Sequence, residues 1–192
     1  LTEAKMQVYG IYTGTKELLS DGINFSEEID KDGGESHILA LKIAVLCNEA
    51  FIENLEEPME KWVARGSPTE RALLLAGVQA GFRRSDLEKL EPKIESLPFD
   101  PVYKYSVSLH KLNKESNILY ILGAPEIILG MSKKLEIDGR QESLTSEKIN
   151  ELEKKHGELT SKGLRVLAVA YRITNIRQFT PPATKESEIP DL

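Results

Sequence analysis

Two adjoining apolar segments with different periods constrain the fold more than any other part of the sequence. Residues 106–110 alternate between polar and apolar, which is typical of a strand with one buried face. Residues 118–122 are continuously apolar and end at Gly-Ala-Pro, which favours a more deeply buried strand. The segment between them, 113–117, is rich in turn-forming residues, so the two strands are predicted to pair as an antiparallel hairpin.

The composition is that of an ordinary water-soluble globular domain. The 192 residues are 40% apolar and 29% charged, and no apolar run approaches the roughly 18 residues that span a bilayer. A net charge of −6 argues against a nucleic-acid partner, which would require a basic patch. The single cysteine, Cys47, cannot form an internal disulfide and has apolar neighbours, so we expect a buried thiol and a reducing, cytosolic environment.

Local signals place further helices and strands on both sides of the hairpin. Ser67 followed by Pro68 and Glu70 predicts a capping box and a helix that runs to about Ala80, where Gly81 stops it. By similar reasoning we expect helices at 37–50 (capped by Ser36), 85–90, 125–131 and about 146–159, strands at 6–12, 94–99 and 164–171, and a tight turn at 138–139. Together these segments predict an α+β fold, a twisted antiparallel sheet of about six strands flanked by helices.

Four motifs, in this order along the chain, carry a resemblance to a known family. They are Gly66–Leu73 (GSPTERAL), Phe99–Lys104 (FDPVYK), Leu122–Glu126 (LGAPE) and Gly163–Tyr171 (GLRVLAVAY). This series resembles the nucleotide-binding (N) domain of P-type cation-transporting ATPases. Each motif alone is weak evidence, whereas four in the family's order are specific, and the resemblance extends over essentially all of residues 1–192.

The resemblance implies a single N domain, inserted in a larger membrane pump and exposed at the cytoplasmic face of the membrane. Such a domain binds ATP or ADP and presents the γ-phosphate to a catalytic aspartate in a neighbouring domain, with Mg²⁺ supplied in the full-length enzyme. The expected partners are the phosphorylation and actuator domains of the same polypeptide. The isolated chain is expected to be monomeric and inactive, with no catalytic residue or metal site of its own, and its two ends should lie close together.

Three side chains would make the principal contacts with the nucleotide, by the same resemblance. Phe99 would stack on adenine, a contact that contributes about 1–3 kcal/mol, and Glu70 would accept a hydrogen bond from the exocyclic amine. Lys104 would reach toward the phosphates. Each residue also has a structural alternative: a core residue at a strand end for Phe99, a helix cap for Glu70, and a solvated lysine for Lys104.

Four more residues complete the expected cofactor-binding set. Gly123 and Ala124 would let the nucleotide approach the backbone, although a strand-to-helix turn uses the same residue types. Arg165, expected to open the last strand, would pair with a phosphate or with a surface carboxylate. Leu122 stands where the family has lysine and is expected to border the nucleotide cavity, the alternative being a buried strand residue.

Two rival functions come from other classes of protein. The loss of positive charge at Leu122, together with Pro101 where some members of the family have arginine, would suit a degenerate interaction module that no longer binds nucleotide. A self-contained ATP-using enzyme is the second rival, but the sequence has no Gly-x-x-x-x-Gly-Lys-Ser/Thr loop to cradle phosphates. The transported ion cannot be read from this chain.

Overall fold

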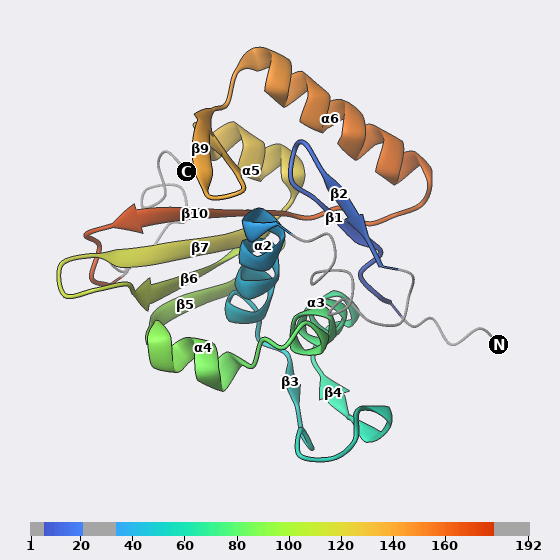
Figure 1. The fold of residues 1–192 in the computed structure, drawn as a ribbon, viewed down its shortest axis with the longest axis vertical. Coiled ribbons are helices and arrows are strands. Elements are labelled where there is room, and N and C mark those ends of the chain that lie inside the picture. Colours follow the sequence, from blue (N-terminus) through green and yellow to red (C-terminus); the bar gives the residue numbers. More distant parts are fainter. Residues whose placement is uncertain (1–5, 21–33, 179–192) are drawn as a thin grey trace.

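The structure is a computed structural model that describes residues 6–20 and 34–178 of the chain (Figure 1). In chain order, the elements are β1 (Gly10–Tyr12), β2 (Glu17–Leu19), α2 (Glu35–Leu46), β3 (Phe51–Ile52), the 3₁₀ turn η1 (Met59–Lys61), β4 (Ala64–Arg65), α3 (Pro68–Gln79), α4 (Arg84–Leu90), β5 (Lys93–Asp100), β6 (Tyr105–Lys111), β7 (Asn117–Gly123), α5 (Pro125–Met131), β8 (Lys134–Ile137), β9 (Arg140–Ser143), α6 (Ser146–Ser161) and β10 (Ala168–Thr174). The ends of the chain, whose proximity the sequence predicts, lie outside the described residues.

The predicted α+β class is confirmed, but the strands are distributed differently from the expected sheet. The central sheet has four antiparallel strands in the order β10-β7-β6-β5, and the predicted hairpin is its β6–β7 pair. The other described strands form three separate two-stranded ribbons, β1–β2, β3–β4 and β8–β9. A sheet of six strands is therefore not what the described residues form.

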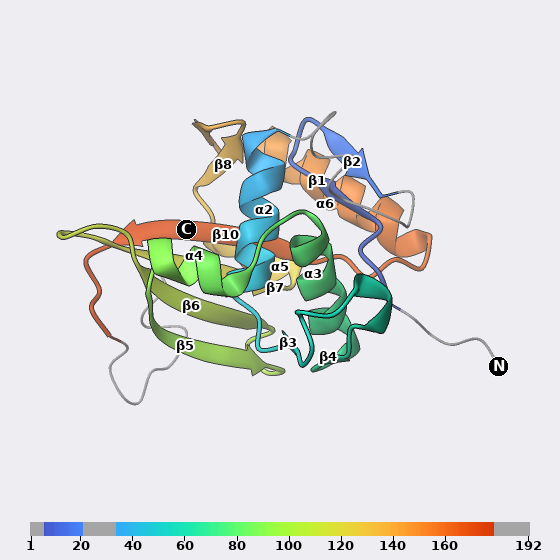
Figure 2. The same ribbon diagram turned by 60° about the horizontal axis from the view of Figure 1, so that its bottom comes forward.

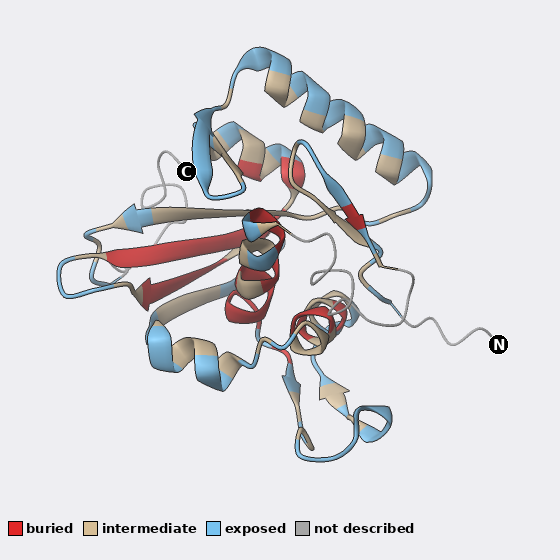
Figure 3. Ribbon diagram, viewed as in Figure 1, coloured by how far each residue is buried: buried red, intermediate tan, exposed pale blue. Residues whose placement is uncertain are grey.

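Helices cover both faces of the central sheet (Figures 1 and 2). Helix α2 packs on one face, called here the α2 face, against the side chains of Ile118, Tyr120 and Leu122. Helix α5 packs on the opposite face, where Ile128 meets Leu119 and Ile121. Because β7 is buried along its whole length, its side chains contribute to both cores, which explains its unbroken apolar sequence (Figure 3).

The ends of two helices show how far local signals decide the structure. Helix α3 begins as predicted, with Glu70 N donating to Ser67 Oγ and Ser67 N donating to a Glu70 carboxylate oxygen. The predicted Ser36 cap of α2 is wrong, because Gly34 takes the capping position and the helix ends at Leu46. Ser36 is instead buried inside α2, and its hydroxyl accepts a hydrogen bond from the Asp138 amide at 2.6 Å.

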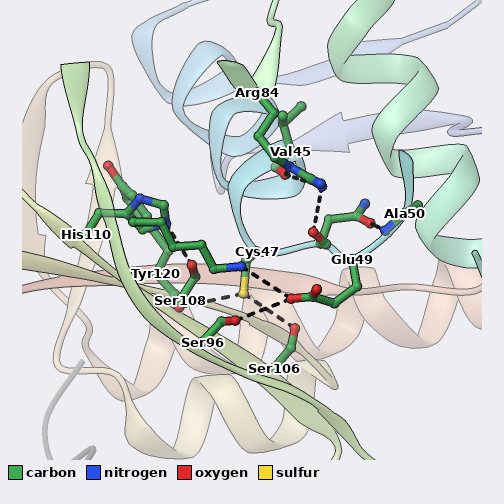
Figure 4. A network of polar contacts seen from close by, with 12 residues as sticks. Val45, Cys47, Glu49, Ala50, Arg84, Ser96, Ser106, Ser108, His110 and Tyr120 are labelled. Atoms are coloured by element: carbon green, nitrogen blue, oxygen red, sulfur yellow. Dashed lines mark hydrogen bonds and ion pairs between the residues drawn. The ribbon is translucent and has the colours of Figure 1, made fainter. Parts of the chain in front are cut away.

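A partly buried carboxylate joins α2 to the sheet. Glu91, at the C-terminal end of α4, accepts hydrogen bonds of 2.6 Å from Lys42 Nζ and from the Tyr120 hydroxyl. Its backbone carbonyl lies 2.9 Å from Nδ1 of His110. Nε2 of the same ring lies 2.7 Å from Ser108 Oγ (Figure 4). Burial and the bond to Glu91 raise the pKa of Tyr120, which therefore stays protonated and donates.

We expect Glu91→Gln to lower the free energy of unfolding by about 1–3 kcal/mol, because the amide cannot accept from both donors. Urea unfolding followed by circular dichroism measures this loss. Glu115→Gln, which makes the same change of charge at an exposed loop position, should stay within about 0.5 kcal/mol of the parent protein. Equal effects of the two substitutions would show that Glu91 does not join these elements.

Candidate functional site

A bulge in the edge strand β5 places Phe99 on the α2 face. Leu97 pairs with Val107 and Asp100 pairs with Tyr105, so that Pro98 and Phe99 together oppose Ser106 alone. The side chain of Ser106 points to the α2 face, where its hydroxyl lies 3.4 Å from Cys47 Sγ. Phe99 is 56% exposed, far more than a core residue at a strand end would be. It is therefore available to a ligand.

Leu122 lies beside Ser106 on the next strand, β7, and is covered by side chains packed on the α2 face. It pairs with Ser106 on one side and Val169 on the other, and its carbonyl accepts a hydrogen bond from Ser106 Oγ at 3.3 Å. Only 7% of Leu122 is exposed, and its side chain belongs to the cluster formed with α2, Leu73 and Leu167. Leu122 also borders a cavity of about 960 Å³ whose lining includes Thr69 and Arg165. Leu122 is thus a buried strand residue that also borders a cavity, whose lining does not include Phe99, Glu70 or Lys104.

Gly123 is required by the sheet itself. A Cβ atom at this position would overlap Cβ of Tyr105 and the carbonyl oxygen of Lys104 on the neighbouring strand. Ala124 follows as the N-cap of α5, and its amide donates to the same Lys104 carbonyl at 2.9 Å. Close packing within the sheet therefore accounts for Gly123 and the start of α5 for Ala124, and their backbone lies at the same end of the sheet as Phe99.

Lys104 occupies a strained turn at that end. Its backbone has φ of 60°, a left-handed conformation that side-chain-bearing residues rarely adopt. Its ammonium group lies 3.3 Å from a carboxylate oxygen of Glu126 in the first turn of α5, and both side chains are 53% exposed. The pKa of Glu126 is lowered, chiefly by its own backbone amide and further by Lys104. An exposed pair of this kind is weak, so an anionic ligand could displace Glu126.

The start of α3 brings Glu70 to the α2 face. Leu73, one turn after Glu70, packs in the same cluster as Leu122. The backbone carbonyl of Glu70 also accepts 2.8 Å from the Asn48 amide, which ties the start of α3 to the segment that follows α2. Glu70 is half-buried, and one of its carboxylate oxygens accepts from Ser67 N in the capping box; the other has no hydrogen-bond donor among the described residues.

Arg165 lies beside α3 but does not open the last strand. Strand β10 begins at Ala168, so the predicted start of this strand at Leu164 is wrong, and Arg165 belongs to the segment that precedes it. Its Nη1 donates to Thr69 Oγ1 at 2.8 Å. Thr69 directly precedes Glu70 in the sequence, so the guanidinium lies at the start of α3. The residue is exposed, so most of its hydrogen-bonding groups face solvent or a ligand.

Sequence reasoning did not single out Ser106 and treated Cys47 only as a buried thiol. Ser106 pairs with Leu122 and lies opposite the bulge that contains Phe99, and its hydroxyl lies 3.4 Å from Cys47 Sγ; no local pattern signals the bulge. Burial raises the pKa of the Cys47 thiol to about 12, so it remains protonated near neutral pH and cannot act as a nucleophile. Among the described residues, no group of three or more His, Cys, Asp or Glu side chains is placed to hold a metal ion.

Comparison with known proteins identifies the family of the chain. Residues 37–190 match the family described as the cytoplasmic domain N of P-type ATPases. This chain belongs to that family. It is 31% identical over 184 residues to the cation-transporting ATPase pma1 of Synechocystis sp., covering 88% of this chain and 20% of that protein. It is 27% identical over 197 residues to a calcium-transporting ATPase of Bacillus subtilis, covering 98% of this chain and 22% of that protein.

The chain therefore spans about a fifth of the length of these curated relatives. A match of similar identity, 31% over 134 residues, is to the sodium/potassium-transporting ATPase subunit alpha-4 of Rattus norvegicus, covering 68% of this chain and 13% of that protein. No helix within residues 6–20 and 34–178 of this N domain is both long enough and apolar enough to span a membrane.

Proposed function

We propose that this N domain binds ATP at the end of the sheet where Phe99, Leu122 and Glu70 meet. The observation that carries the proposal is the β5 bulge, which brings an exposed aromatic ring into line with the end of β7. Adenine would stack on Phe99, and the second carboxylate oxygen of Glu70 would accept a hydrogen bond from its amine. Lys104 and Arg165 would be the cations that meet the phosphates, the first after it leaves Glu126.

In the full-length enzyme, the bound ATP would be presented to an aspartate of a neighbouring phosphorylation domain. Phosphoryl transfer depends mainly on positioning and on Mg²⁺, so the N domain contributes binding and orientation. The pump would couple this reaction to cation transport, with the actuator domain of the same polypeptide as a further partner. The isolated, monomeric chain would bind ATP or ADP weakly and would not hydrolyse it, because the nucleophile is supplied from outside this domain.

Titration of the ¹⁵N-labelled domain with ATP, followed by chemical-shift changes, tests this proposal. We expect shifts of the backbone amides around Phe99, at 122–124 and at the start of α3, saturating at millimolar ATP, with little further change on adding Mg²⁺. No perturbation around Phe99 at millimolar ATP would contradict ATP binding and favour the degenerate interaction module. Perturbation confined to another surface would show that the site has been placed wrongly.

A further inference from the structure

A second ion pair lies on the α2 face, along the same edge strand as Phe99. Lys93, the first residue of β5, extends its side chain so that Nζ lies 3.5 Å from Oε1 of Glu49. The same carboxylate oxygen lies 3.4 Å from Ser96 Oγ. The ammonium group is therefore carried along the strand toward the level of Ser96, which is three residues, or about 10 Å of strand, from Phe99.

The contacts of Glu49 and Cys47 join this pair to the row that contains Phe99. Figure 4 shows Glu49, Ser96, Ser106 and Cys47 clustered on one side of the sheet. Ser106 is the residue opposite the bulge and bonds to Cys47 Sγ at 3.4 Å. Lys93 and Glu49 both act electrostatically on the buried Cys47 thiol. The pair therefore lies near Cys47 and Ser106, the residue opposite the bulge that contains Phe99.

Lys93 differs from the two proposed cations, Lys104 and Arg165, in where its partner lies. Lys104 is paired with Glu126 on α5, which lies on the opposite face of the sheet, and Arg165 is bonded to Thr69. Position 122 carries leucine and adds no charge. The side chain of Lys93 is 31% exposed and that of Glu49 is 54% exposed, so the carboxylate is the more solvated partner and the more easily displaced.

We propose that Lys93 is a further cation of the nucleotide site and that Glu49 restrains it until an anionic ligand binds. This inference rests on the proposed ATP binding and deepens it, because it assigns nucleotide affinity to an ion pair outside the four motifs. On binding, the ammonium would exchange the Glu49 carboxylate for the negative charge of the nucleotide. Its four-carbon stem allows this movement without any change in β5.

Opposite effects of two substitutions test the proposal. Lys93→Gln should weaken ATP binding about threefold to tenfold, whereas Glu49→Gln should strengthen it by a similar factor, because it releases the ammonium and removes a competing negative charge. Both effects should shrink as salt is raised from about 0.05 M to about 0.5 M, since partly exposed charges are screened. ATP and adenosine are titrated in parallel, and the effect on ATP should be the larger.

The exposed pair of Lys89 and Asp86 on α4 provides matched controls. Lys89→Gln and Asp86→Asn change the net charge of the protein by the same amounts and should leave ATP affinity unchanged. Unchanged ATP affinity in Lys93→Gln, or an equal loss for ATP and adenosine, would overturn the role of Lys93 while ATP binding itself stands. Absence of ATP binding by the parent domain would instead contradict the proposed function, and this inference with it.

Discussion

Leu122→Lys is expected to lower the free energy of unfolding by about 2–4 kcal/mol, because it places an ammonium where only 7% of the leucine is exposed. The surrounding side chains come from α2, α3 and the segment before β10, and include Ile43, Leu73 and Leu167. None of these three can pair with a charge. Part of the cost is avoided if the long side chain extends into the cavity that Leu122 borders.

Leu122→Met separates the effect of charge from that of shape. Methionine has a volume close to that of leucine and no charge, so its cost should remain below about 1.5 kcal/mol. The same two variants also examine the proposed site. If the nucleotide lies beside position 122, saturating ATP should raise the melting temperature of the lysine variant more than that of the methionine variant, since the phosphates supply the missing partner. Equal increases would place the nucleotide elsewhere.

The parts of the fold that sequence predicted best are those whose causes are local. The capping box of α3 needs only Ser67, Pro68 and Glu70, and helix α5 begins at Pro125 and ends at Met131 as predicted. The hairpin of β6 and β7 follows from period and turn residues alone. The cap and the start of α5 depend on residues a few positions apart, and the two strands of the hairpin are joined by one short turn, so the sequence pattern contains most of the cause.

The errors concern features that depend on distant partners. Serine is a common N-cap residue, but the hydroxyl of Ser36 accepts a hydrogen bond from the amide of Asp138, more than a hundred residues away. The tight turn predicted at 138–139 joins β8 to β9, but nothing local reveals that this pair forms a ribbon of its own, separate from the four-stranded sheet. The start of β10 at Ala168 is likewise set by its pairing with Gly123, not by the apolar run that begins earlier.

The candidate site was predicted through motifs rather than through geometry, and this explains what was missed. The resemblance led to Phe99, Leu122 and Glu70; the strand pairing places Phe99 and Leu122 on either side of Ser106, and Glu70 lies in the first turn of α3, whose Leu73 packs in the same cluster as Leu122. The resemblance did not indicate that Ser106 lies between the first two, because this depends on one extra residue in β5. The Glu49–Lys93 pair was missed because its members are 44 residues apart along the chain.

Phe99→Ala is expected to weaken ATP binding by about ten- to a hundredfold, the loss of a base–aromatic stack worth about 1–3 kcal/mol. Its effect on folding should be small, because the ring is 56% exposed and buries little apolar surface. Isothermal titration calorimetry or NMR titration gives the affinity, and urea unfolding gives the stability of the same sample. A stacked adenine should also shield the protons of the Phe99 ring in the parent domain.

Val102→Ala is the matched control, since Val102 lies in the turn after Phe99 and is 80% exposed. It removes apolar surface from the same end of the sheet and should change neither affinity nor stability measurably. Phe99→Trp adds a third arm, because an indole preserves the aromatic face and should retain binding within a few-fold. Loss of affinity in Phe99→Ala with retention in Phe99→Trp requires an aromatic face at this position. If alanine binds ATP as well as phenylalanine does, the base does not stack on β5, and the bulge has only a structural role.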